Sequence, residues 1–248
     1  MPPAAPSHAV SPQGSRPAHG WLADGHRITD GRPSVVAMID LDRPGDGIAV
    51  RAAAAADAHR LLGLDLRAAA HLADHWVRGG DVTAVYESND ARRLRATAMW
   101  RQHPATPPVR AWELVVSAQT SLLESDPLLA VVADAAAEDL RWGTVRGPAI
   151  HWHDAVTEEA TCLLLSPARP AAGASMLLAA HPTDAGRFDV ARREGRMHVA
   201  CWLFPTTLEK GVLLRSRVLA AVGPATAATD WATPLTAAFA ASPPMLTT

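Results

Sequence analysis

Two histidines one residue apart are the sharpest chemical feature of the sequence. His151 and His153 flank Trp152 in the stretch IHWHD. On a β-strand, side chains two residues apart point to the same face, so both imidazoles would face the same way. Paired imidazoles can bind a divalent metal ion or move protons in acid/base catalysis. Glu158 follows after a short turn, so His151, His153 and Glu158 are the candidate metal ligands.

The spacing G-x3-H-x-H-x4-E that ends at Glu158 resembles the first sequence motif of the cupins. The resemblance implies a divalent metal held by His151, His153 and Glu158, with a fourth ligand from His181 or His198. It is confined to this short segment, and no second cupin motif follows it. The alternative is that both histidines lie on a half-exposed strand face with no metal.

Charged side chains recur on one face of several expected strands. Arginine and glutamate on the face of a wide antiparallel sheet can bind the hydroxyl or carboxylate groups of a ligand. The alternative is a solvated outer face with cross-strand ion pairs. The candidate substrate-binding residues of this kind are Glu87, Arg95, Arg101, Glu113, Arg215 and Arg217.

His181 and Lys210 lie at the ends of apolar runs, where groups beside rigid strands often carry function. Lys210 alternates in phase with Val212, so we expect it at the edge of the core, where a lysine can act as a base. Together with His151 and His153, these two residues complete the candidate catalytic set. The alternative for Lys210 is a side chain that extends its amine to solvent.

Composition restricts the class of protein. The 248 residues, 48% hydrophobic and 19% charged, suit a globular domain with a sizeable core. The net charge of −2 gives no basic excess for nucleic acid, and no apolar run is long enough to span a membrane. The first residues carry no apolar segment typical of secretion, so we expect a cytoplasmic protein. Cys162 and Cys201 lie in apolar runs and are predicted to be buried, reduced thiols.

The pattern of apolar residues predicts mostly strands. Residues 65–78 show helical spacing after a potential cap and before two glycines, so we expect a helix there. Residues 81–87 and 93–101 alternate with period two across a polar turn and predict a hairpin. Residues 128–135 fit either a strand or a helix. The remaining expected strands are 34–41, 48–51, 109–120, 160–165, 174–180, 187–195, 196–205 and 208–222.

These elements predict a mainly β protein, an antiparallel β-sandwich with one or two short helices. We expect a disordered arm over 1–20, a single domain over 21–224 and a C-terminal tail over 225–248 with at most one helical turn. The nucleotide-binding, nucleophile-elbow and zinc-protease motifs are absent from the sequence.

The strand number, the chain length and the polar strand faces resemble the galactose-mutarotase supersandwich or a related lyase sheet. The resemblance implies a carbohydrate-directed protein, an epimerase-like or mutarotase-like or lyase-like enzyme that works by general acid/base proton transfer. Eight tryptophans against three phenylalanines and one tyrosine suit a sugar-like small-molecule ligand, because indoles stack on sugar rings. The alternatives are a cupin-like metalloenzyme and a non-catalytic interaction module. The protein would need either no cofactor or a divalent metal, and a homo-oligomer is compatible with the sequence.

Overall fold

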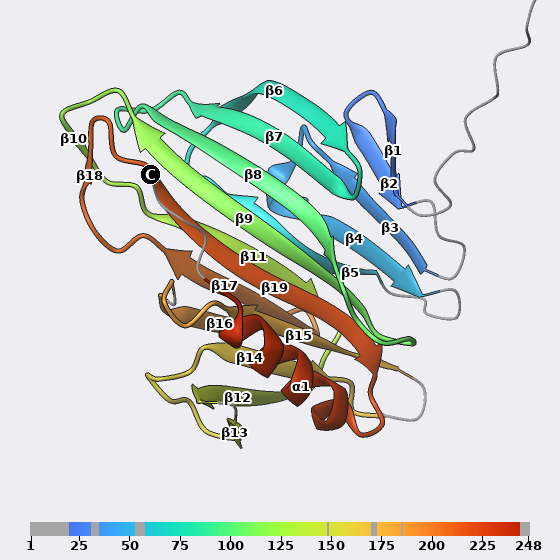
Figure 1. Ribbon diagram of the computed structural model, residues 1–248. Coiled ribbons are helices and arrows are strands. Elements are labelled where there is room, and N and C mark those ends of the chain that lie inside the picture. The colour runs from blue at the N-terminus through green and yellow to red at the C-terminus, as the bar shows by residue number, and fades with distance from the viewer. Residues whose placement is uncertain are drawn as a thin grey trace, which may run out of the picture.

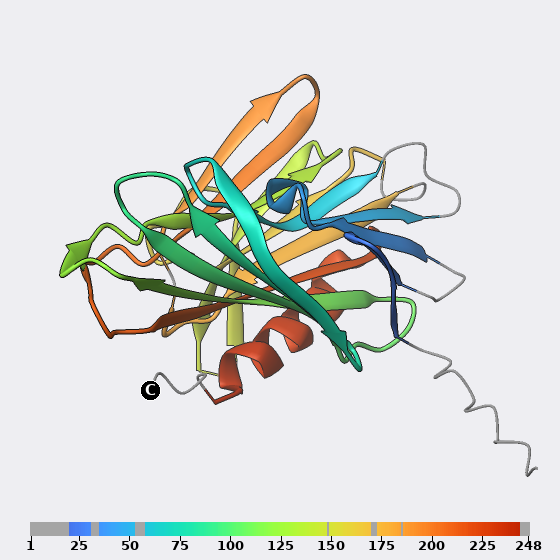
Figure 2. The same cartoon turned by 90° about the horizontal axis from the view of Figure 1, so that it is seen from above.

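Two antiparallel β-sheets packed face to face make up most of the molecule (Figures 1 and 2). This arrangement confirms the predicted mainly β, antiparallel sandwich. The expected arm over 1–20 falls outside the described part of the chain except for Gly20, and so do the last five residues. The computed structural model describes residues 20–30, 35–52, 58–147, 149–169, 173–184 and 186–243.

Each sheet is a continuous antiparallel ladder. In spatial order, sheet A consists of β1 (Trp21–Asp24), β2 (Arg27–Asp30), β3 (Val35–Asp40), β4 (Ile48–Ala52), β5 (His59–Asp65), β11 (Leu129–Ala135), β17 (Arg196–Leu203) and β16 (Phe188–Arg193). Sheet B consists of β13 (Ala149–His153), β12 (Asp139–Arg146), β14 (Cys162–Ser166), β15 (Ala174–Ala180), β19 (Leu214–Pro224), β9 (Arg110–Thr120), β8 (Leu94–His103), β7 (Asp81–Ser88) and β6 (Ala70–Arg78). The short strands β10 (Glu124–Ser125) and β18 (Leu208–Glu209) pair separately.

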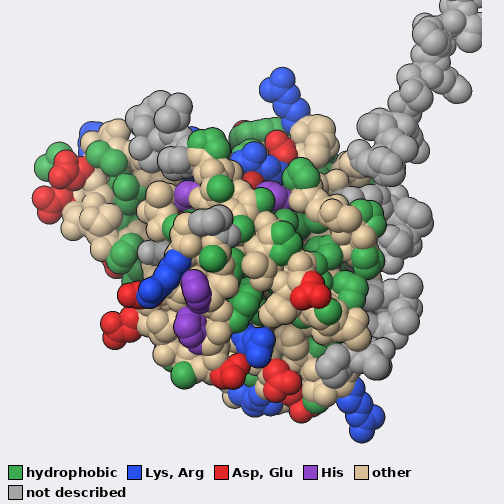
Figure 3. Space-filling view, turned by 60° about the horizontal axis from the view of Figure 1, so that its bottom comes forward, with side chains coloured by type: hydrophobic (Ala, Val, Ile, Leu, Met, Phe, Trp, Pro, Cys, Tyr) green, Lys and Arg blue, Asp and Glu red, His purple; other side chains and the backbone are tan. Residues whose placement is uncertain are grey.

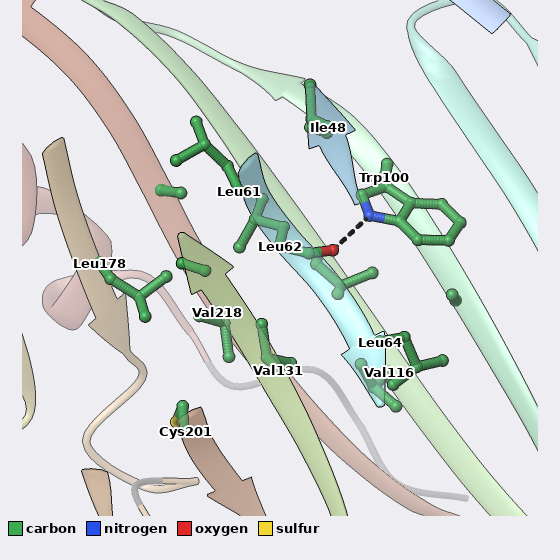
Figure 4. Close-up of a cluster of buried hydrophobic side chains, with 14 of the residues drawn as sticks. Ile48, Leu61, Leu62, Leu64, Trp100, Val116, Val131, Leu178, Cys201 and Val218 are labelled. Carbon is green, nitrogen blue, oxygen red and sulfur yellow. Dashed lines mark hydrogen bonds between the residues drawn. The ribbon is translucent and has the colours of Figure 1, made fainter. Parts of the chain in front are cut away.

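The core lies between the two sheets and is filled by the inward-pointing residues of each strand. Two polar side chains of sheet B also reach across it. The indole Nε1 of Trp100 donates a hydrogen bond to the carbonyl of Leu62 at 2.8 Å (Figure 4). The hydroxyl of Tyr86 donates to the carbonyl of Leu41 at 2.9 Å, and burial raises the pKa of this phenol. These bonds satisfy buried carbonyls and fix the spacing of the sheets.

A β-bulge in β5 explains why Leu62 offers its carbonyl to the core. Between Val132 and Asp134 the register with β11 shifts, so two residues of β5 oppose one residue of β11. Leu62 has a positive φ of 56°, and both Leu61 and Leu62 are fully buried. Because of the extra residue, the side chains of β5 that follow the bulge point to the opposite face of the sheet from the one they would reach in a regular strand.

The helix α1 (Ala228–Ala241) covers part of the outer face of sheet B (Figure 1). Phe239 and Ala232 of the helix pack against Leu177, Leu219 and their neighbours in a second apolar cluster. The helix is longer than the single turn expected in the tail. No helix in the described part of the chain has the length and apolarity to cross a membrane.

The predicted helix over 65–78 is wrong, because most of this segment forms the edge strand β6. A second bulge between Leu72 and Asp74 interrupts its pairing with β7. The residues packed on the core are therefore spaced irregularly, at Ala70, Leu72 and then Val77. Such mixed spacing looks helical, and cross-strand pairing outweighs the helix propensity of the alanines.

The predicted strand over 208–222 is interrupted. The chain turns at Gly211, which has a φ of 86°, and β19 starts only at Leu214. Lys210 and Val212 are consequently exposed on this turn, so the expectation that Lys210 lies at the core edge is wrong. The hairpins over 34–51, 81–101 and 187–205 are confirmed by the strand pairing, and residues 128–135 form a strand.

Cys162 and Cys201 are free, as expected, and fully buried in the two different apolar clusters. Burial raises the pKa of each thiol to about 12. Because the thiolate is the reactive form, we expect neither cysteine to react with a thiol reagent at neutral pH. A colorimetric thiol assay would check this, with the same protein in guanidinium chloride as the control in which both thiols react. Rapid labelling of the folded protein would contradict the prediction.

Replacing Trp100 by phenylalanine removes the donor to Leu62 and keeps most of the apolar volume. We expect the free energy of unfolding to fall by about 1–3 kcal/mol, because the Leu62 carbonyl becomes unpaired inside the core. Urea denaturation measures the change. Trp76→Phe is the matched control, since Trp76 is 45% exposed, and it should change stability by less than about 0.5 kcal/mol. Equal effects of both variants would refute this role for the bond.

Candidate functional site

The structure places His151, His153 and Glu158 on the surface. Strand β13 is the edge of sheet B, and all three side chains are exposed. Figure 3 shows histidine side chains on the outside of the molecule, among tan, green and charged surface. Within the described ranges, no group of three or more histidine, cysteine, aspartate or glutamate side chains is arranged to hold a metal ion. Trp152 between the histidines packs under α1 and donates to Thr233 Oγ1 at 3.0 Å.

The six predicted substrate-binding residues all lie on the outer face of sheet B. Glu113 on β9 is buried between Arg101 on β8, whose Nε lies 3.1 Å from the carboxylate, and Arg217 on β19, at 3.6 Å. The side chains of Glu113 and Arg217 are each 6% exposed. The others lie further along the same face, where Arg95 pairs with Glu87 and Arg215 donates to Ser117. Their substrate-binding role stays a prediction.

His181 and Arg217 hold the C-terminal end of α1 against sheet B. His181 is 2% exposed, and its Nε2 donates to the carbonyl of Ser242 at 3.0 Å. Arg217 donates to the hydroxyl of Ser242 at 3.1 Å, and its guanidinium lies over the ring of Phe239. Both residues therefore hold the C-terminal end of α1 on sheet B. Lys210 lies on an exposed turn instead, so the structure does not bring the four candidate catalytic residues together.

A polar groove of about 800 Å³ crosses the outer face of sheet A. Its floor includes the short side chains of Val132 and Ala200, which are register partners on neighbouring strands. The next row along the strands is polar and holds Arg60, Asp134 and His198, which are register partners across β5, β11 and β17. On the other side of the floor lies Asp65, and the β16 end carries Asp189. A groove of this size with convergent polar groups is typical of a small-molecule site.

Backbone geometry makes this face hollow. The β5 bulge puts Arg60 and Asp65, which are an odd number of residues apart, on the same face of the sheet. At one end the 3-10 turn η1 (Pro44–Asp46) lies directly on Gly63, and a Cβ there would meet the Gly45 carbonyl oxygen at 2.2 Å. At the other end the β16–β17 hairpin projects beyond the sandwich (Figure 2). A fixed wall and a projecting wall therefore enclose the row of small residues.

His198 and Asp134 form an acid/base pair in the groove. The Nδ1 of His198 lies 2.9 Å from Asp134 Oδ2, and because an ionised carboxylate only accepts, Nδ1 donates. The other carboxylate oxygen binds Arg196, whose guanidinium also donates to the Ala58 carbonyl at 2.8 Å. No described residue bonds Nε2 of His198, and its side chain is 41% exposed. The pairing fixes the tautomer and leaves Nε2 open to a ligand, as in catalytic histidines.

The sequence marks these groups only faintly. Asp134 is the single charged residue of an apolar strand, His198 shares its strand with Arg196, and the sequence suggests for His198 only the role of a fourth metal ligand. Their contact depends on the pairing of β11 with β17, in which Asp134 and His198 are register partners about 64 positions apart in the sequence. Local periodicity does not reveal the register between such distant strands. Nothing in the sequence except their charge indicates that Arg60, Arg193 and Arg196 line the groove.

The fold and the groove define an antiparallel β-sandwich protein with a polar site on one sheet. No family model matches the sequence, and no curated protein matches it. The crystal structure of HI1317 is 8% identical, with a TM-score of 0.47 over 79% of this chain and 92% of that protein. A second structure is described as "Putative kojibiose phosphorylase from human microbiome"; it is 7% identical, with a TM-score of 0.51 over 91% of this chain. This chain spans only 37% of that protein's length, and the likeness shows a shared fold.

Replacing Gly63 by alanine should close the fixed end of the groove or displace η1. We expect the free energy of unfolding to fall by about 1–3 kcal/mol, since the new methyl group has no space beside the Gly45 carbonyl. Thermal or urea unfolding would measure this. Gly80→Ala is the control, because a Cβ at Gly80 meets nothing within 4 Å. A Gly63→Ala variant as stable as the control would show that the close approach of η1 is not rigid.

Proposed function

We propose that this chain is a carbohydrate-directed enzyme that transfers protons on a sugar bound in the groove of sheet A, with His198 as the acid/base group. The observation that carries the proposal is the His198–Asp134 pair, 2.9 Å apart on the wall of the groove. A carboxylate that accepts from Nδ1 holds the ring in place and stabilises the imidazolium that forms when Nε2 takes a proton.

The rest of the groove suits a sugar. Its floor of Val132 and Ala200 lets a flat ring approach the sheet, while Arg60 and Asp65 on either side offer donors and acceptors for hydroxyl groups. Sugar mutarotation needs one group that removes the proton of the anomeric hydroxyl and another that protonates the ring oxygen. The Asp65 carboxylate can take the proton of the anomeric hydroxyl while the imidazolium form of His198 donates its Nε2 proton to the ring oxygen, and the reverse transfers on ring closure restore both groups. The fold shared with a protein described as a kojibiose phosphorylase is in keeping with a sugar substrate.

The test is the rate at which the two anomers of free sugars interconvert, measured by NMR exchange or polarimetry over a panel of aldoses. We expect wild type to accelerate the exchange of at least one sugar. His198→Gln should lower that acceleration by about 10²-fold or more, because the amide cannot exchange a proton at neutral pH.

The matched control is His26→Gln. His26 Nδ1 also lies 2.9 Å from a carboxylate, that of Asp42, but this pair is exposed away from the groove. The control should retain the wild-type rate. If no aldose exchanges faster with wild type, or if His198→Gln is as active as the control, the proposed function is overturned.

A further inference from the structure

One end of the groove gathers arginine side chains from both strands of the projecting hairpin. Arg193 on β16 and Arg196 on β17 are direct register partners across the hairpin, and both line the groove. Arg60 on β5 lines the groove at the opposite side, next to η1. Like charges directly opposite each other destabilise a strand pair, so this end of the hairpin gains stability from a negative charge placed between them.

The carboxylates nearby do not balance these cations. Asp134 is shared between Arg196 and His198, and Asp46 pairs with Arg60 at 2.5 Å. Arg193 makes no hydrogen bond or ion pair with any described residue, so its whole guanidinium fork is available.

The other two carboxylates that line the groove, Asp189 on β16 and Asp65 on β5, accept hydrogen bonds within the protein. Asp189 accepts from the Trp202 indole at 2.7 Å and from Arg187 at 2.9 Å, and Asp65 accepts from the backbone of Arg67. Among the arginines that line the groove, Arg193 therefore carries the positive charge that no described carboxylate balances.

We infer that the groove binds a sugar that carries a carboxylate or a phosphate, with the anionic group held by Arg193 beside Arg196. This inference rests on the proposed function and adds the substrate class. A guanidinium binds either anion through two parallel hydrogen bonds, and a volume of about 800 Å³ accommodates a sugar ring together with such a substituent. With the anion at this end, the ring lies over the small residues of the floor, next to His198.

The experiment is calorimetric titration of the full chain with glucose, glucuronate, glucose 6-phosphate and inorganic phosphate at low ionic strength. We expect at least one of the two anionic sugars to bind about tenfold or more tighter than glucose, because a charge-assisted bidentate contact is added. The stronger of the two identifies the carboxylate or the phosphate as the anion. It should also bind tighter than inorganic phosphate, since the ring contributes contacts of its own.

Arg193→Gln should remove most of this preference, so that the anionic sugar and glucose bind the variant with similar affinity. Arg78→Gln, an exposed arginine on β6 of the opposite sheet, is the matched control and should behave like wild type. Unfolding curves of both variants establish that they are folded, as expected for exposed side chains.

Equal binding of glucose and both anionic sugars would overturn this inference and leave the proposed function standing. An anion preference that survives in Arg193→Gln would also overturn it. If no sugar of either charge binds and the anomer exchange is absent as well, both proposals fail together.

Discussion

The hydrogen bond from Trp100 to the Leu62 carbonyl is the contact on which the rest of the sandwich depends. The bulge in β5 places two consecutive leucines in the core and turns one backbone carbonyl away from the ladder. An unpaired carbonyl there would cost free energy comparable to a lost hydrogen bond, and the indole of the opposite sheet satisfies it. The same bond fixes where β8 crosses β5, so it joins the two sheets at the bulge of β5.

The bulge of β5 also determines which of its side chains reach the candidate site. A regular strand would send Arg60 and Asp65 to opposite faces, and the groove would lose one side. With the extra residue, both reach the outer face, and Gly63 between them leaves the space in which η1 packs against the sheet. The residues that fill the core and the residues that line the groove are therefore set by one local irregularity of the backbone.

Local sequence pattern predicted the fold class and most hairpins, because alternation and turn residues are read within a few positions. It failed where bulges disturbed alternation: β6 was expected to be a helix, and nothing indicated the phase change of β5. The candidate site shows the same division. His151 and His153 were noticed because they are neighbours in sequence, whereas Asp134 and His198 meet only through the pairing of distant strands. The charged residues of sheet B were placed on one face correctly, and the buried ones among them also help to hold α1.

The two ends of the groove differ in whether main-chain atoms or side chains form them. Main-chain atoms of η1 form one end, in contact with a residue that has no side chain, so exchanging amino acids there alters the architecture before it alters selectivity. The other end is made of side chains on a projecting hairpin, which can be replaced or lengthened with little effect on the sandwich. Substitutions that change ligand preference, in evolution or in protein engineering, are therefore tolerated in the hairpin and are not tolerated in the turn.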